Sequence, residues 1–120
     1  MVSPLVNQLA VMRNDEINHE LIKAADHIIL SPGPGLPSDS NELLNVIDKY
    51  HKTHNMLGVC LGHQALGNYF GIGLKNLNKV LHGVSSEINI CNNDILYKNL
   101  YNSFQIGHYH SWVIDELPKE

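Results

Sequence analysis

The feature that most constrains the fold is a decapeptide rich in proline and glycine, "SPGPGLPSDS", at residues 31–40. Its three prolines and two glycines exclude both a helix and a ladder of strand hydrogen bonds, because proline lacks an amide donor and glycine favours turns. Directly before it, the apolar, β-branched run "HIIL" at residues 27–30 predicts a short strand. The chain is therefore expected to pass from a strand straight into a stiff loop.

Helices are expected on both sides of this loop. Apolar residues at helical spacing predict a helix over residues 15–25, which begins behind the capping residues Asn14 and Asp15. Ser40 is expected to cap a second helix, whose apolar stripe ends near His54.

A second strand and a third helix complete the first half of the chain. Residues 56–60 are predicted to form a buried strand, and residues 62–70 the helix that follows it. Short buried strands that alternate with helices are typical of α/β proteins. We therefore expect a three-layer, open, mostly parallel sheet with helices on both faces.

The pattern changes after Gly73. Residues 83–90 alternate apolar and polar side chains, which predicts an antiparallel or edge strand. The segment "NDILYKNL" predicts a short helix capped by Asn92 or Asn93, and residues 103–114 predict another strand with a turn in it.

Composition indicates an ordinary globular protein that occupies residues 1–120 as a single domain. Eight basic and twelve acidic residues give a net charge of −4, which argues against a nucleic-acid partner and against binding to anionic membranes. The first twelve residues make a poor signal peptide, because no positive residue precedes their apolar stretch. We therefore expect a cytoplasmic protein whose two cysteines, Cys60 and Cys91, are reduced.

The pentapeptide "GVCLG" at residues 58–62 is the principal candidate for chemistry. A nucleophile at a sharp strand-to-helix turn needs small neighbours, and G-x-nucleophile-x-G supplies them. The N-terminus of the following helix favours a thiolate at Cys60, and the N–H of Leu61 can point at an oxyanion. The alternative is that Cys60 is a small buried hydrophobic residue, and spacing alone leaves both readings open.

The proline-rich loop strengthens the first reading. It follows the neighbouring predicted strand, so both loops would emerge at the carboxyl edge of the sheet, where ligands bind in open α/β folds. The glycine N–H groups at residues 33 and 35, held by prolines, suit a carbonyl oxygen that becomes negative.

Four motifs in order, "SPGPGLPSDS", "GVCLGHQALGNYFG", "KVLHGVSS" and "YHSWV", resemble those of the class I glutamine amidotransferases. Within that family, the "SPGPG" form of this loop resembles the loop of the glutaminase subunits of anthranilate synthase and aminodeoxychorismate synthase. The resemblance implies a flavodoxin-like sheet and, as partner, a synthase (component I) subunit. It implies that Cys60 attacks the side-chain amide of L-glutamine to form a thioester and that the released ammonia passes to that partner. The reaction is expected to need no cofactor and no metal.

Further site residues are implied only by this resemblance. The glutamine-binding residues would be Gly33, Pro34, Gly35, Gln64, Ser111 and Trp112, with Gly35 and Leu61 at the oxyanion. His82 and Gly83 would belong to the face that meets the synthase. The chain departs from the family at His108, where an arginine is usual, and at Trp112, which is commonly a leucine.

The family's catalytic histidine and carboxylate come from an "FHPE"-like motif after "YHS", and residues 112–120 contain no such motif. The family's opening strand is also missing, so the sequence is expected to be a fragment, truncated at both ends and inactive alone. Two alternatives remain open at this point: a non-catalytic remnant module, and a thiol hydrolase acting on another amide. His63 and His110 are not expected to replace the base, nor are His108 and His110 expected to hold zinc, because no third ligand is evident.

Overall fold

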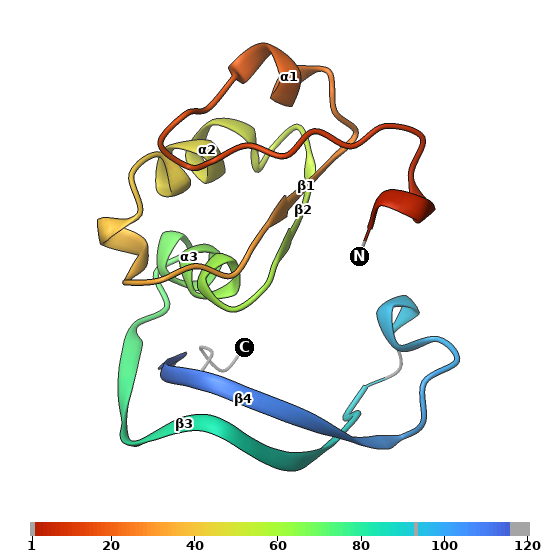
Figure 1. Ribbon diagram of the computed structural model, residues 1–120, viewed down its shortest axis with the longest axis vertical. Helices are drawn as coiled ribbons and strands as arrows, with labels where there is room; N and C mark the ends of the chain where they lie inside the picture. Colours follow the sequence, from red (N-terminus) through yellow and green to blue (C-terminus); the bar gives the residue numbers. More distant parts are fainter. Residues whose placement is uncertain (1, 93, 116–120) are drawn as a thin grey trace. The chain divides into compact units, whose positions relative to one another are not determined.

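The computed structural model describes residues 2–92 and 94–115, which form two compact units (Figure 1). The first unit contains the chain as far as Leu74 and again from Ile114, and the second is Lys75–Val113. A single turn of 3-10 helix, Ser3–Leu5, lies near the beginning of the first unit.

Two parallel strands, β1 (His27–Leu30) and β2 (Asn55–Gly58), form the sheet of the first unit. They pair in register from His27 with Asn55 to Leu30 with Gly58, so both strands end at the same level. The predicted strand at residues 27–30 is confirmed. The end predicted for the second strand is wrong, because β2 stops at Gly58 rather than at residue 60. The prediction that this strand is buried is also wrong, because its residues are half-buried or exposed.

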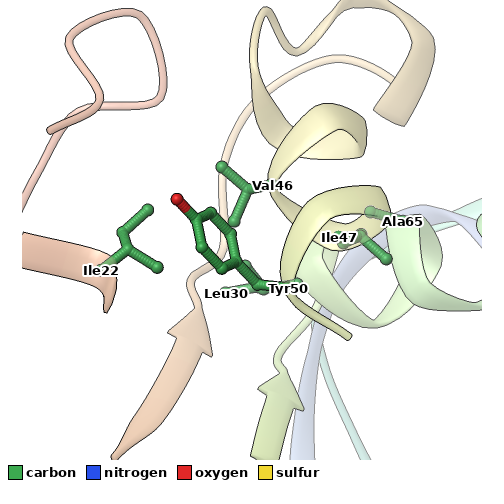
Figure 2. Packing of buried hydrophobic residues seen from close by; sticks show 6 residues of the cluster. All are labelled: Ile22, Leu30, Val46, Ile47, Tyr50 and Ala65. Carbon is green, nitrogen blue, oxygen red and sulfur yellow. The ribbon is translucent and has the colours of Figure 1, made fainter. Parts of the chain in front are cut away.

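Two helices, α2 (Leu43–Tyr50) and α3 (Leu61–Tyr69), follow the loop and the second strand as predicted. The core of the first unit joins six buried side chains, with Ile47 completely inaccessible; Figure 2 shows them: Ile22, Leu30, Val46, Ile47, Tyr50 and Ala65. The Tyr69 hydroxyl donates a 2.7 Å hydrogen bond to the carboxylate of Asp48, which connects α3 to α2.

One face of the strand pair belongs to this core, since Ile28 and Met56 pack against it beside Leu30. On the other face, the paired residues Ile29 and Leu57 remain 46% and 48% exposed. The first unit therefore has the helix-on-sheet packing of an α/β protein, as the sequence predicts.

Helix α1 (His19–Lys23) is shorter than the predicted helix over residues 15–25. Its cap is Asn18, whose side-chain oxygen accepts hydrogen bonds from the N–H groups of Glu20 and Leu21 at 3.0 and 3.3 Å. Asp15 instead accepts hydrogen bonds from Arg13. The prediction failed because several Asx residues in this stretch offer competing caps.

Ser40 does not cap α2 with its side chain, contrary to the prediction. Its buried hydroxyl donates to the carbonyl oxygen of Leu36 at 2.7 Å, across one turn of 3-10 helix at Pro37–Asp39. The decapeptide thus contains a single helical turn, because proline is tolerated at the first position of a helix. Glu42 occupies the cap position of α2.

In the second unit the long strands β3 (Leu74–Asn89) and β4 (Ser103–Ile114) form a two-stranded sheet. The Ser103 hydroxyl donates a hydrogen bond to Glu87, and the Ser85 hydroxyl donates one to Gln105. The later residue of β3 thus pairs with the earlier residue of β4, so the two strands run antiparallel. The predicted antiparallel strand at residues 83–90 is confirmed in part, because β3 is longer: it begins at Leu74 and ends at Asn89. The turn predicted within residues 103–114 is wrong, because β4 is continuous.

The segment between these strands contains one 3-10 turn, Ile95–Tyr97, where a short helix was predicted. Asp94 caps it, since its carboxylate accepts from the N–H of Leu96 at 2.9 Å. The predicted cap Asn92 does not serve this role, and the alternative Asn93 lies outside the described residues.

Candidate active site

A sharp turn connects β2 to α3 at Cys60. The N–H of Val59 donates to the carbonyl oxygen of Leu30 at 2.9 Å, so pairing with β1 continues one residue past β2. Cys60 then adopts φ 52° and ψ −108° and occupies the N-cap position of α3. A residue with a Cβ atom is strained in this region, and such strain is concentrated at functional sites.

The glycines on either side of Cys60 are required by close backbone contacts. A Cβ atom at Gly62 would lie 2.2 Å from the carbonyl oxygen of Leu30, and one at Gly58 would lie 2.6 Å from the backbone of Gly62. No larger residue fits either place without displacing main chain. The G-x-C-x-G spacing therefore has the packing function that the sequence indicates.

Cys60 is exposed, so the interpretation of this residue as a small buried hydrophobic is wrong. The first hydrogen bond of α3 runs from the N–H of Gln64 to the carbonyl oxygen of Cys60 at 2.9 Å. The amide groups of the first turn, which have few acceptors within the helix, give this end a partial positive charge. Amide donors of this first turn therefore lie next to Cys60 in the chain.

The proline-rich loop packs onto the same turn. A Cβ atom at Gly33 would lie 2.8 Å from the side chain of Leu61, and Leu61 is buried. Gly35 has φ +80°, which favours glycine, and both loop glycines are exposed. The first unit thus brings together the loop, Cys60 and the first turn of α3, where Gln64 is 7% exposed.

The other two candidate residues, Ser111 and Trp112, are half-buried on β4. Ser111 belongs with Trp112 to the second unit, whereas the remaining candidates all belong to the first.

No hydrogen bond joins the Cys60 thiol to a histidine in the described part of the chain. His63 is exposed on α3. Within residues 2–92 and 94–115, no three side chains of the metal-binding types are grouped to hold an ion.

Sequence reasoning missed one group of side chains. His108 and His110 were considered together only as metal ligands, and Ser86 was not connected with them. The structure places the Ser86 hydroxyl 2.5 Å from His108 Nε2, and His108 Nδ1 lies 3.0 Å from His110 Nε2. No local pattern gives the register between two strands so far apart in sequence.

A parallel strand pair that ends in a strained, cysteine-bearing turn defines an α/β protein with a sharp strand-to-helix elbow. The family model of "Glutamine amidotransferase class-I" matches residues 3–120. The chain belongs to the class I glutamine amidotransferase family.

Similar proteins agree with this assignment. "Anthranilate synthase component 2" of Pyropia yezoensis is 43% identical over 118 residues, which are 97% of this chain and 62% of that protein. The protein of the same name from Saccharolobus solfataricus is 41% identical over 124 residues, with 98% and 64% covered. The chain thus spans somewhat less than two thirds of the length of these relatives.

A solved structure shows the same fold. A protein from Thermoplasma acidophilum, described as a GMP synthase subunit, superposes with a TM-score of 0.80 at 22% identity, over 98% of this chain and 59% of that one. Separately, none of the helices in the described residues has the length and apolar character needed to cross a membrane.

Proposed function

We propose that this chain carries the glutamine-binding half of an anthranilate synthase component 2, the subunit that releases ammonia from L-glutamine. The exposed and strained Cys60 at the elbow is the observation that carries the proposal. The names of the two relatives above, at 43% and 41% identity, support anthranilate synthase over the alternative, aminodeoxychorismate synthase.

The proposed reaction begins at Cys60. Its thiolate attacks the carboxamide carbon of glutamine, the oxygen becomes negative, and the N–H groups of Gly35 and Leu61 stabilise that charge. The C–N bond then breaks, nitrogen leaves as ammonia with an added proton, and a glutamyl thioester remains. Water hydrolyses the thioester to glutamate and restores the thiol.

Gly33, Pro34 and Gln64 would contact the glutamine near its reacting end, while Ser111 and Trp112 would hold its amino-acid end through the backbone. These roles come from the family motifs that the residues match. The chemistry uses a cysteine and general acid-base catalysis alone, so we propose a reaction without a cofactor or metal, in the cytoplasm.

A chorismate-binding synthase (component I) subunit is the proposed recipient of ammonia. His82 and Gly83 are proposed to lie on the surface that meets it. His82 is exposed and its ring packs edge-on against Tyr109 at 5.1 Å between centroids, beside Gly83 with φ +68°. Loss of co-purification in His82→Ala, with Cys60 labelling retained, is the expected result.

A glutamine-like electrophile, the diazoketone analogue of glutamine, tests the proposal on the chain as it stands. We expect one covalent adduct on Cys60, protection by L-glutamine, and no adduct in Cys60→Ser. Cys91 is the internal control, because it is also exposed yet lies far from the elbow in sequence. Equal labelling of both cysteines, or labelling that glutamine does not slow, contradicts the proposal.

A second candidate is a glutamine-binding module without turnover. It is favoured by the lack, in the described residues, of a histidine bonded to the Cys60 thiol, because the nucleophile needs a base. This candidate predicts that glutamine binds but that no glutamate is released, even with the synthase subunit present. Glutamate release that disappears in Cys60→Ser excludes it.

A further inference from the structure

The proline-rich loop between β1 and α2 has an exposed half and an anchored half (Figure 1). Residues 31–35 are all exposed, whereas Leu36 is half-buried and both Pro37 and Ser40 are buried. The 3-10 turn Pro37–Asp39 in the second half contacts α3 and α2. The two loop glycines thus lie on the surface, while the residues that follow them belong to the packed part of the first unit.

Two polar side chains hold the anchored half. Ser40 Oγ donates to the carbonyl oxygen of Leu36 at 2.7 Å, and Asn14 Nδ2 donates to the carbonyl oxygen of Ser40 at 3.1 Å. The N–H of Glu42 in turn donates to the carbonyl oxygen of Asn14 at 3.1 Å. We call these three hydrogen bonds the Asn14–Ser40 clasp. It ties the end of the loop to a residue 26 positions earlier in the chain.

The beginning of the loop is held separately, by the elbow itself. The N–H of Val59 donates to the carbonyl oxygen of Leu30 at 2.9 Å. Gly33 lies so close to Leu61 that an added Cβ atom would be 2.8 Å from that side chain. Neither contact involves Asn14 or Ser40. The position of Gly33 therefore does not depend on the clasp.

Gly35 lies between these two anchors and has the greatest backbone freedom in the loop. The ring of Pro34 fixes φ at that residue, whereas glycine has the widest choice of φ and ψ. Gly35 adopts φ +80°, and an added Cβ atom there would meet no atom of the described residues within 4 Å. The neighbouring residue Leu36 is the one that Ser40 holds. Fixing Leu36 thus limits the conformations open to Gly35.

We infer that Asn14 and Ser40 are positioning residues for the oxyanion: by holding Leu36 they keep the N–H of Gly35 in its place at the elbow. This inference rests on the proposed function, which assigns Gly35 as an oxyanion donor. A donor of this kind is effective only when it is held in position before the charge develops. All the residues concerned belong to the first unit.

Ser40→Ala and Asn14→Ala each remove one hydrogen bond of the clasp and leave its acceptor paired. The carbonyl oxygen of Leu36 retains the N–H of Asp39 at 3.0 Å, and that of Ser40 retains the N–H of Leu43 at 3.0 Å. Because no buried acceptor loses its last partner, both variants are expected to fold.

Asn18→Ala is the matched control. It is the same chemical change as Asn14→Ala, four positions further along the chain. It removes the two hydrogen bonds that cap α1, neither of which involves the loop. An effect that follows from lost stability alone would therefore appear in this variant too.

Two reagents for Cys60 separate the oxyanion from the thiol. In the chloroketone analogue of glutamine, the thiolate adds to the ketone carbon and the oxygen becomes negative. Sulfur then bonds to the neighbouring carbon, chloride leaves, and the ketone is restored. Chloroacetamide is attacked directly at its CH2 carbon and develops no such charge. The ratio of the two labelling rates therefore reports the oxyanion donors rather than the reactivity of the thiol.

In both clasp variants, the maximal rate of chloroketone labelling is expected to fall about tenfold, which is less than the complete loss of an oxyanion donor would cause. The concentration that gives half the maximal rate should stay the same, because Leu61 still holds Gly33. Labelling by chloroacetamide in these variants, and by both reagents in Asn18→Ala, should stay within about threefold of the natural chain.

An equal loss in Asn18→Ala, an equal loss with both reagents, or an unchanged maximal rate in the clasp variants overturns the inference. If the natural chain is not labelled by the chloroketone, or L-glutamine gives no protection, the proposed function fails. Nitrogen-15 relaxation at Gly35 then decides whether the clasp holds this residue. Greater motion of its N–H in Ser40→Ala than in Asn18→Ala supports positioning, and equal motion refutes it.

Discussion

The Cys60 turn and the hydrogen-bonded row of Ser86, His108 and His110 are organised in opposite ways. The Cys60 turn is shaped by main chain: Gly58 and Gly62 allow contacts that no Cβ atom permits, and Cys60 itself is strained. The row is shaped by side chains, whose hydrogen bonds join β3 to β4. Glycine therefore has two roles in one chain, tight backbone packing at Gly58 and Gly62 and a positive φ at Gly35 and Gly83.

The largest expected effect is that of Gly62→Ala. The added Cβ would lie 2.2 Å from the Leu30 carbonyl oxygen, so main chain must move and the free energy of unfolding should fall by about 3 kcal/mol. Gly73→Ala is the matched control, because its Cβ meets only Asp115 at 3.8 Å. Urea unfolding measures both, and equal stabilities would show that the elbow is not held by backbone contact.

Replacement of Cys60 should separate strain from chemistry. Cys60→Gly relieves the positive φ and is expected to stabilise the chain by about 1 kcal/mol, whereas Cys60→Ala retains a Cβ and should give no such gain. Both substitutions abolish labelling by the glutamine analogue. Thermal unfolding compares them, and a Cys60→Ala variant as stable as Cys60→Gly would argue against strain at this residue.

Gly107→Ala tests whether the row of Ser86, His108 and His110 compensates for a glycine within β4. Its Cβ would lie 3.4 Å from the ring of Tyr109, an ordinary contact, so about 0.5 kcal/mol of stability should be gained from the stiffer strand. Ser86→Ala alone should lose about 1 kcal/mol, as for a typical hydrogen bond. In the double variant, the net loss of stability should be smaller than the sum of the two separate changes predicts. Denaturation of the natural chain, the two single variants and the double variant measures this difference as a double-mutant cycle. Strict additivity would show that the stabilisation by Ser86 does not depend on Gly107.

The smallest effect is expected at the α2–α3 contact, where neither glycine nor strain is involved. The hydrogen bond from Tyr69 to Asp48 raises the pKa of Tyr69 above its ordinary value. A raised pKa means that the stabilisation is present below the ordinary tyrosine range and disappears as pH rises through the raised value. Tyr69→Phe should therefore melt slightly below the natural chain at neutral pH, and the difference should vanish at strongly alkaline pH.

Much of the first unit could be predicted because its signals are local. The strand at residues 27–30, the helix Leu61–Tyr69 and the G-x-C-x-G turn each follow from adjacent residues. The errors occurred where neighbours compete. Asn18 caps α1 in place of Asn14 and Asp15, and Ser40 bonds Leu36 instead of capping α2.

The strand β4 was predicted, but its continuity was missed for a related reason. Gly107 indicates a turn when only the sequence is considered, but pairing with β3 holds the segment extended. Likewise, the exposure of Cys60 depends on how α3 packs against β1, which no spacing rule measures.

The sequence by itself determined the α/β class, the cysteine-bearing turn and the family motifs, because glycine, proline and apolar spacing restrict the backbone within a few residues. The tertiary structure decided which Asx residue caps α1, where β2 ends, and that Ser86 meets His108. Those outcomes depend on register and close approach between segments distant in sequence, and the free energies that select them arise only when the segments are packed together.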